Sequence, residues 1–322
     1  MGLWLLLVTL ACPIFFVSEA PGNDFSSHLA TAWLAHDGFA GGPWAAWYRF
    51  DLVPLPYWLP TLLLAPLTTL LGPPLGLQVL LAGLLAALPL ALRAVERAAG
   101  REPSATATAL ALLAGFNWAY WLGELSFLLG LPAALWAMAA WLRLGADPRA
   151  RRLAAFAAWT VAAYLAHIYA LCAVLGFMAV SSLLALLGRA RVSGAQWASW
   201  ILPLGLFGLG AWLILGGKGA AAHQGGLVFD FAPWRLADSL ALPFMITVGP
   251  RWWAAIMPAI VLGLGLLSDR RRWDLRLLGA GVGFWLLAWA GPAGLETPFG
   301  LEDIGRRFSP WGVLLLAAGL GP

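Results

Sequence analysis

Two ionisable side chains one helical turn apart, Asp24 and His28, form the first pair in the sequence that can do acid–base chemistry. A carboxylate and an imidazole four residues apart lie on one face of a helix, where they can share a hydrogen bond and a proton. Two simpler interpretations stay open, because Asp is a preferred N-cap residue and histidine often forms the polar tip of an interfacial side chain. A Ser-His-Asp arrangement with Ser26 or Ser27 is disfavoured, because the sequence has no nucleophile-elbow motif there.

Glu124 and His167 interrupt long apolar stretches, where an ionisable group is expensive to place and by default indicates function. Glu124 follows Tyr-Trp-Leu-Gly, and His167 lies halfway through an apolar run that is flanked by arginines on both sides. The alternative for either residue is a structural one, in which its side chain satisfies backbone groups at a helix end.

Arg306 and Arg307 stand together just before the last apolar stretch. A guanidinium group binds phosphate through two parallel hydrogen bonds, so an anionic phosphate is one ligand that would explain this pair. Interfacial anchoring, or pairing with the nearby Glu302 and Asp303, is the competing explanation. Lys218, beside two glycines, is a weaker phosphate candidate, and a simple flexible tether is the favoured interpretation there.

The composition places these residues in a membrane protein. Of the 322 residues, 61% are hydrophobic and only 11% are charged, against about 45–50% and 25% in a soluble domain. This balance excludes a soluble enzyme, a nucleic-acid binder and, with only two cysteines, a disulfide scaffold. The apolar stretches are continuous rather than alternating, which predicts an all-α, polytopic transmembrane helical bundle and not a β-barrel.

A spanning helix needs about 20 apolar residues, and ten stretches approach this length. They are 1–17, 75–92, 105–121, 125–142, 153–168, 170–188, 196–216, 252–267, 277–293 and 310–322. The first could instead be a cleaved signal peptide, although no Lys or Arg precedes it. The last is shorter than a full span, which indicates a truncated chain.

The basic residues predict which way the bundle faces. If 56–72 does not cross, thirteen of the nineteen fall on one side: Arg93, Arg97, Arg101, Arg143, Arg149, Arg151, Arg152, Arg189, Arg191, Arg270, Arg271, Arg272 and Arg276. The positive-inside rule assigns this side to the cytoplasm. We therefore expect about ten spans, an inside amino terminus, and 56–72 as a re-entrant or interfacial helix on the outer side.

The chain is then a single transmembrane domain, 1–322, with outer loops at 18–74, 217–250 and 294–309. The first loop should contain an interfacial amphipathic helix from Phe25 to about His36. Its apolar stripe is Phe25, Leu29, Ala32 and Trp33, and the adjacent polar stripe is Asp24, His28 and Thr31. The polar stripe would face an aqueous cavity at the outer surface.

Most of the twenty tryptophans should form an aromatic belt at the membrane interfaces. Trp44, Trp47, Tyr48, Tyr57 and Trp58 of the first loop could also stack on a sugar ring or flank an isoprenoid tail. No HxxxH, HExxH or CxxC pattern, P-loop or suitably placed GxGxxG occurs, so no cofactor is predicted and a divalent metal has no motif to support it.

The order of these features resembles the GT-C-type glycosyltransferases, polytopic enzymes that use polyprenyl-phosphate-linked sugars. The resemblance is carried by Asp24 after the first apolar stretch, by Pro-Leu-Pro-Tyr-Trp at 54–58, by the segment 122–132 around Glu124, and by Arg306-Arg307-Phe308. It covers roughly 1–145 and 294–322 by feature and the middle of the chain only by topology. One departure is that no second acid stands beside Asp24, which argues against metal-dependent forms.

The resemblance implies transfer of a sugar from a polyprenyl-phosphate carrier to an acceptor at the extracytoplasmic face of a cell membrane, the inner membrane in a bacterium. Asp24 is then the catalytic base, and Arg306 or Arg307 stabilises the departing phosphate. His28, Glu124 and His167 are expected to orient the acceptor or the sugar hydroxyls. The implied partners are the polyprenyl-phosphate-linked sugar and membrane lipid, and no nucleic acid.

Two other classes of protein stay open at this point. A secondary transporter would also have broken helices, but the sequence has no evident internal repeat and almost no ionisable residue at a span centre. A non-catalytic membrane scaffold, in which Asp24 is only a helix cap, would lack a cavity large enough for a sugar beside Asp24.

Overall fold

The computed structural model describes four long stretches of the chain, 24–48, 53–216, 273–290 and 306–320. It also describes residues 14–15, 22, 227–228, 239–240, 242–244, 256, 259–260, 262–263, 266, 294–295 and 301–302. Most of the first predicted span, most of 217–250 and 252–267, and Arg270–Arg272 lie outside the described residues.

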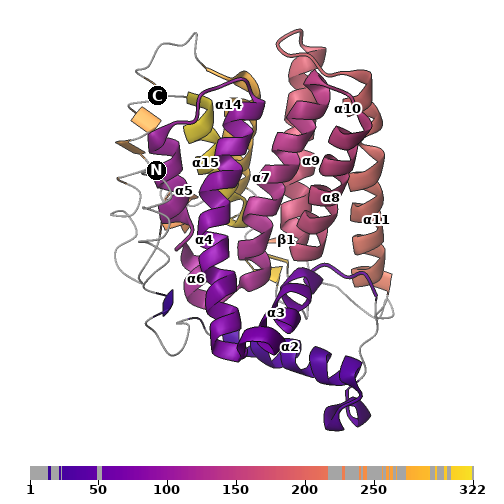
Figure 1. Ribbon diagram of the computed structural model, residues 1–322. Helices are drawn as coiled ribbons and strands as arrows, with labels where there is room; N and C mark the ends of the chain where they lie inside the picture. The colour runs from indigo at the N-terminus through magenta and orange to yellow at the C-terminus, as the bar shows by residue number, and fades with distance from the viewer. Residues whose placement is uncertain are drawn as a thin grey trace.

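The described residues are predominantly helical (Figure 1). The longer helices are α2 (Phe25–Ala40), α3 (Trp58–Leu71), α4 (Pro73–Ala98), α5 (Ala105–Ala114), α7 (Leu125–Ala146), α8 (Ala150–Ala166), α9 (Ile168–Leu186), α11 (Ile201–Gly216), α14 (Leu275–Ala290) and α15 (Ser309–Leu320). Short helices are η2 (Pro43–Ala46), α6 (Trp118–Leu122), α10 (Gly194–Ala198), η3 (Leu242–Phe244) and η5 (Arg306–Phe308).

Three two-residue strands form a small antiparallel sheet in the order β1 (Leu227–Val228), β2 (Gly294–Leu295), β3 (Leu301–Glu302). Leu227 pairs with Leu295, and Leu295 pairs with Leu301. No strand was predicted from the sequence. The sheet joins the loop 217–250 to the loop 294–309, which were predicted to lie on the same side.

Helix α7 forms the centre of the bundle, and nearly all of its residues are buried. It packs against α4 on one side and against α8 and α9 on the other (Figure 1). Helices α14 and α15 pack on each other, α14 also packs on α9, and α15 also packs on α5. Its 22 residues span about 33 Å at 1.5 Å per residue. The two ends of α7 therefore mark two well-separated ends of the bundle.

Arginines gather at one end, which we call the arginine-rich end. Arg143 at the end of α7 donates a hydrogen bond to the carbonyl of Ala94 in α4, and it is close enough to Arg97 and Arg152 to interact electrostatically. Asp147 in the connection to α8 pairs with Arg149 at 3.0 Å. These arginines thus gather at one end of the bundle, and the assignment of that end to one side of a membrane stays a prediction.

Helices α2 and α3 lie at the opposite end, where α2 runs across the base of the bundle (Figure 1). The backbone N–H of Asp24, just before α2, donates to the carbonyl of Leu122 at 3.0 Å. Helix α3 has 14 residues, about 21 Å, which is shorter than the roughly 30 Å of a hydrocarbon core. This length fits the prediction that 56–72 does not cross.

The predicted helix in the first loop is present, but its apolar stripe is only partly buried. Phe25 and Ala32 are buried and Leu29 packs against the core, whereas Trp33 is 49% exposed. Trp33 therefore does not belong to the packed face. The face turned to the core instead continues through Ala35, which is buried.

Two predicted spans are interrupted. The stretch 105–121 is divided into α5 and α6 because the Asn117 side chain accepts hydrogen bonds from the N–H groups of Ala119 and Tyr120, which starts a new helix. The stretch 196–216 is divided into α10 and α11 at residues 199–200, where the Ser199 hydroxyl donates to the carbonyl of Gln196. At Asn117 a polar capping residue overrides the continuous hydropathy.

Three of the described helices, α4, α7 and α9, are long and apolar enough to cross a membrane. Shorter apolar helices are α3, α14 and α15. These lengths are consistent with membrane association, and the number of ten spans stays a prediction.

Helices α14 and α15 approach each other backbone to backbone at glycines. A methyl group on Gly281 would stand 2.7 Å from the backbone nitrogen of Leu316, and one on Gly312 would stand 3.0 Å from the nitrogen of Trp285. Small residues allow such close packing between apolar helices in a membrane. This contact fixes α15, and with it the preceding η5, against the bundle.

We expect Gly281→Ala to destabilise the protein by about 1–3 kcal/mol, because the added methyl group must push two backbones apart. The control is Gly283→Ala, whose methyl group would meet its nearest atom, in Val180, at 3.9 Å. Thermal unfolding in detergent should show a lower midpoint for the first variant than for the second. Equal midpoints would contradict the close packing of α14 and α15.

Candidate functional site

An ion pair at the end opposite the arginine-rich end joins two residues that are 183 positions apart in the chain. The Arg307 guanidinium donates to both carboxylate oxygens of Glu124, with Nη1–Oε2 at 2.5 Å and Nη2–Oε1 at 3.1 Å. Both side chains are only 19% exposed. A bidentate pair of this kind is both strong and directional, so it ties η5 to the start of α7.

Aromatic rings surround the guanidinium of Arg307. Its central carbon lies 5.4 Å from the ring centre of Trp118, 5.6 Å from that of Tyr169 and 5.7 Å from that of Phe127. A cation over aromatic faces gains electrostatic energy, most when water is excluded. The three rings come from α6, α9 and α7, so the arginine is a point at which these helices meet.

His167 is the single residue between α8 and α9, and it is buried. Its Nδ1 accepts a hydrogen bond from the backbone N–H of Tyr169 at 3.2 Å, which caps α9. Burial, and then the positive charge of Arg307, lower the pKa of His167 well below its usual value. The ring is therefore neutral at pH 7, with its proton on Nε2.

Gly130 in α7 lets the junction between α8 and α9 approach the central helix. A methyl group on Gly130 would stand 2.9 Å from the Cβ of Ala170 and 3.4 Å from that of His167. This close approach holds the histidine against α7, one helical turn and a half from the ion pair at the start of the same helix.

Tyr57 lies next to this cluster in a strained conformation. It is the one described non-glycine residue with a positive φ, 81°, which costs an L-residue roughly 1–2 kcal/mol. Its ring contacts that of His167 edge to face at 4.7 Å between centroids. Burial raises the pKa of Tyr57, while nearby Arg307 lowers it and Glu124 raises it, so the phenol lies within electrostatic reach of the ion pair.

The segment before α3 is held in place by α8. The Tyr164 hydroxyl donates to the carbonyl of Pro54 at 2.7 Å. Because this bond fixes the chain three residues before Tyr57, it helps to maintain the strained backbone. Strain of this type is common at binding and catalytic sites.

Asp24 and His28 reach the same end of the bundle through α2. Asp24 stands at the N-cap position of α2, but its exposed side chain makes no capping hydrogen bond. The N-cap role is therefore not what this carboxylate performs. Gly123 has a φ of 82°, and a methyl group there would stand 2.7 Å from the backbone nitrogen of Asp24. A side chain at position 123 would therefore prevent the backbone of Asp24 from packing this closely against Gly123.

His28 is half-buried one turn after Asp24. Burial lowers the pKa of His28, and the neighbouring carboxylate of Asp24 raises it, with burial the larger effect. The imidazole is therefore mostly neutral at pH 7 and able to accept a proton. Asp24 and His28 therefore interact electrostatically, and their role as an acid–base pair stays a prediction.

A cleft of about 200 Å³ opens between α2 and the start of α3. It is lined by Thr31, Leu55, Pro56, Tyr57, Trp58 and Thr61. Thr31 continues the stripe of Asp24 and His28 along α2, so the predicted polar stripe ends at a cavity.

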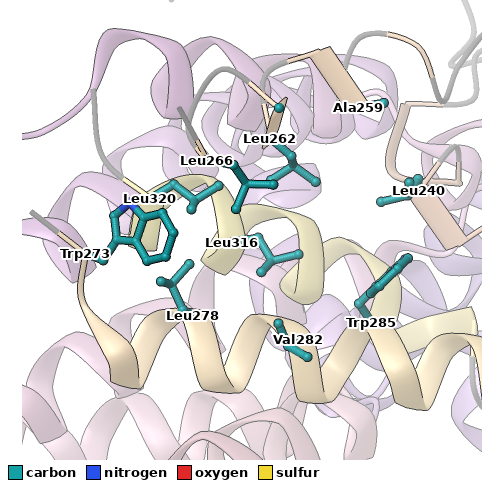
Figure 2. Close-up of a pocket in the computed structure, with 11 residues that line it drawn as sticks. Leu240, Ala259, Leu262, Leu266, Trp273, Leu278, Val282, Trp285, Leu316 and Leu320 are labelled. Carbon is teal, nitrogen blue, oxygen red and sulfur yellow. The ribbon is translucent and has the colours of Figure 1, made fainter. Parts of the chain in front are cut away.

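An apolar groove of about 470 Å³ runs along α14 and α15 (Figure 2). Figure 2 shows the side chains of Leu278, Val282 and Trp285 on one face of α14 and those of Leu316 and Leu320 on α15 turned toward it. Leu240 contributes to the groove, and the hydroxyl of Ser309, two residues after Arg307, donates to the carbonyl of the adjacent Ser239. The groove therefore extends toward the end of the bundle that holds the ion pair.

Of the six predicted site residues, the structure brings Glu124, His167 and Arg307 into one cluster. Asp24 and His28 adjoin it through Leu122 and Gly123. Arg306 is part of η5, but its side chain lies outside what the structure describes. Arg307 contacts the carboxylate of Glu124, a partner that the sequence did not predict, whereas the side chains of Glu302 and Asp303, the alternative partners, lie outside what the structure describes.

Trp118, Phe127 and Tyr169 were missed as site residues, and Thr61 was missed as part of the cleft. Tyr169 stands two residues after His167, and Phe127 stands three after Glu124, so both share a turn with a predicted site residue. Trp118 is not close in sequence to a predicted site residue. It reaches the guanidinium because the chain breaks at Asn117, just before α6. Among the described residues, no group of three His, Cys, Asp or Glu side chains is positioned to hold a metal ion.

Comparison with protein-family models, with characterised proteins and with solved structures gave no match for this chain. The resemblance to GT-C-type enzymes therefore rests on residues and topology alone.

We expect Glu124→Leu and Arg307→Met each to lower the free energy of unfolding by about 3 kcal/mol, because each leaves an unpaired charge that is mostly buried. The double variant should recover part of that loss, because neither charge is then left alone. Unfolding in mixed micelles measures all three. Losses that simply add in the double variant would show that the two side chains do not stabilise each other.

We expect Asp24→Asn to lower the pKa of His28, because it removes the carboxylate that favours the imidazolium. Nuclear magnetic resonance titration of the histidine ring signals, with His28→Gln to assign them, measures this change. Glu102→Gln, at an exposed acid near the arginine-rich end, is the control and should leave the pKa of His28 in place. An unchanged pKa in Asp24→Asn would mean that the two side chains do not interact.

Proposed function

We propose that this protein is a membrane glycosyltransferase that moves a sugar from a polyprenyl-phosphate carrier to an acceptor. The observation that carries the proposal is the convergence of Asp24, His28, Glu124, His167 and Arg307 at one end of an apolar bundle. Segments far apart in the chain supply these groups, a small cleft adjoins them at Tyr57 and Thr31, and an apolar groove runs along α14 and α15.

Asp24 is the base in this proposal. The acceptor oxygen attacks the anomeric carbon of the sugar, the bond from that carbon to the phosphate oxygen breaks, and the electron pair leaves with the phosphate. The acceptor proton passes to the carboxylate of Asp24, which is exposed and has no capping role. His28, one turn away and mostly neutral, can take up that proton or hold the acceptor.

Arg307 supplies the positive charge for the phosphate. Its contact with Glu124 uses two of the five guanidinium N–H groups, and the others are donors that phosphate oxygens would take. The aromatic rings and the carboxylate fix the guanidinium before any ligand binds. A donor fixed in advance costs no reorganisation when charge develops on the leaving group.

The apolar groove gives a polyprenyl chain a place to lie. Its described lining is hydrophobic from Trp273 near the arginine-rich end to Leu240 near Ser309, so it would accept an apolar chain and reject a polar one. A carrier seated there would have its phosphate at the end where η5 holds Arg307. Lipid and sugar would then meet at one site.

The central helix favours surface chemistry over transport. No residue from Leu125 to Leu142 is ionisable, and this stretch of α7 is almost entirely buried. A transporter needs polar groups near the middle of its spans. In the part of the chain that the structure describes, the charged side chains discussed above lie instead toward the two ends of the bundle.

The sidedness of the site follows from the arginines. If the arginine-rich end is cytoplasmic, as the positive-inside rule proposes, the cluster lies at the extracytoplasmic face of a multi-pass protein in the cell membrane. Polyprenyl-linked sugars and membrane lipid are then its partners at that face.

We expect Asp24→Asn to lower the rate of sugar transfer by at least about 100-fold, because general-base catalysis contributes 10²–10⁴. The assay incubates purified full-length protein with a panel of polyprenyl-phosphate-linked hexoses and pentoses, and it measures sugar released or transferred. Glu102→Gln should retain the wild-type rate. Wild-type rates in Asp24→Asn would remove the proposed base, and no turnover by the wild type with any donor would contradict the proposed function.

A further inference from the structure

We propose that the cleft between α2 and the start of α3 binds one neutral pyranose ring. Its lining comprises Thr31, Leu55, Pro56, Tyr57, Trp58 and Thr61. The place of this ring in a transfer reaction rests on the proposed function, whereas binding of the ring itself can be measured without turnover.

The size of the cleft limits its ligand to a single ring. Its volume of about 200 Å³ is below the 300–1,000 Å³ typical of drug-sized ligands. A single six-membered ring with its hydroxyl groups matches a cleft of this size better than an oligosaccharide, a nucleotide or a lipid chain does.

The chemistry of the lining fits a sugar. Thr31 and Thr61 offer hydroxyl groups from opposite walls, and none of the six lining residues is charged. Hydroxyls both donate and accept hydrogen bonds, as the hydroxyls of a sugar do. Tyr57 and Trp58 supply aromatic surface for the apolar face of the ring, together with a polar O–H and N–H. A purely apolar ligand would leave the hydroxyl groups without hydrogen bonds, and a charged ligand would find no opposite charge in the lining.

The cleft is already formed without a ligand. The Thr31 hydroxyl donates to the carbonyl of Ser27 at 2.9 Å, which orients its oxygen as an acceptor. Tyr57 has a positive φ. Its position is maintained by the contact with the ring of His167 and by the hydrogen bond from Tyr164 to Pro54. A binding site fixed in this way loses little entropy when its ligand arrives.

The cleft also lies where a sugar would be needed. Thr31 follows Asp24 by seven residues, two turns along the same face of α2. Tyr57, on the other wall, is within electrostatic reach of Glu124 and Arg307. A ring in the cleft would therefore have the proposed base along one wall and the proposed phosphate site beside the other.

The test is saturation-transfer nuclear magnetic resonance on the full-length protein in detergent micelles, with a panel of methyl pyranosides as probes. At least one pyranoside should bind, and Thr31→Val and Thr61→Val should each weaken it about 3- to 10-fold, the loss of one neutral hydrogen bond. Thr69→Val is the matched control. Thr69 lies on α3, the helix of Thr61, and its hydroxyl hydrogen-bonds the carbonyl of Ala65 and the ring of His36, outside the cleft.

The outcomes distinguish failure of the sugar site from failure of the glycosyltransferase proposal. Binding that Thr31→Val and Thr61→Val leave unchanged, or no binding by any pyranoside, overturns the sugar site. If a pyranoside binds in the cleft but no polyprenyl-linked donor turns over, the sugar site stands and the glycosyltransferase proposal fails. If transfer depends on Asp24 while both threonine variants keep the wild-type affinity, the sugar site fails alone. Circular dichroism of each variant shows whether it is folded.

Discussion

The pair between Glu124 and Arg307 is the interaction on which one end of this molecule depends. A guanidinium that is mostly out of water needs a carboxylate partner, and the bidentate contact of Glu124 provides it. Because the partners belong to the start of α7 and to η5, the pair links the centre of the bundle to its last helix. Trp118, Phe127 and Tyr169 around the guanidinium exclude water, so the pair and its surrounding helices stabilise one another.

The rest of that end is built on close backbone approaches. Gly123 admits the segment before α2, Gly130 admits the α8–α9 junction, and Gly281 admits α15. In a membrane the hydrophobic effect does not drive one apolar helix against another, and close packing with polar contacts takes its place. Glycines thus bring polar side chains from distant segments together, and the ion pair fixes them there.

Much of this arrangement could be predicted from the sequence, and the reasons for success and failure differ. The membrane class, the helices α4, α7 and α9, and the side shared by the arginines follow from composition and charge. Separate stretches were predicted at 153–168 and 170–188, and the structure places His167 between the corresponding helices α8 and α9. The break at Asn117 was missed because hydropathy averages over a cap, which depends on one side chain. The break between α10 and α11, at residues 199–200, was missed as well. The partner of Arg307 was missed because it lies 183 residues away, and no local pattern records such a contact.

The junction of α8 and α9 consists of one residue, His167, whose extended backbone turns the chain while its ring caps the second helix. One additional residue at the start of α9 would rotate every following side chain by about 100° around the helix axis. Tyr169 would then leave the guanidinium, and the ring stack with His167 would be lost. An insertion at the junction of α8 and α9 would therefore disrupt the surroundings of the Glu124–Arg307 pair. A homologous chain with an insertion there would need other side chains around its ion pair.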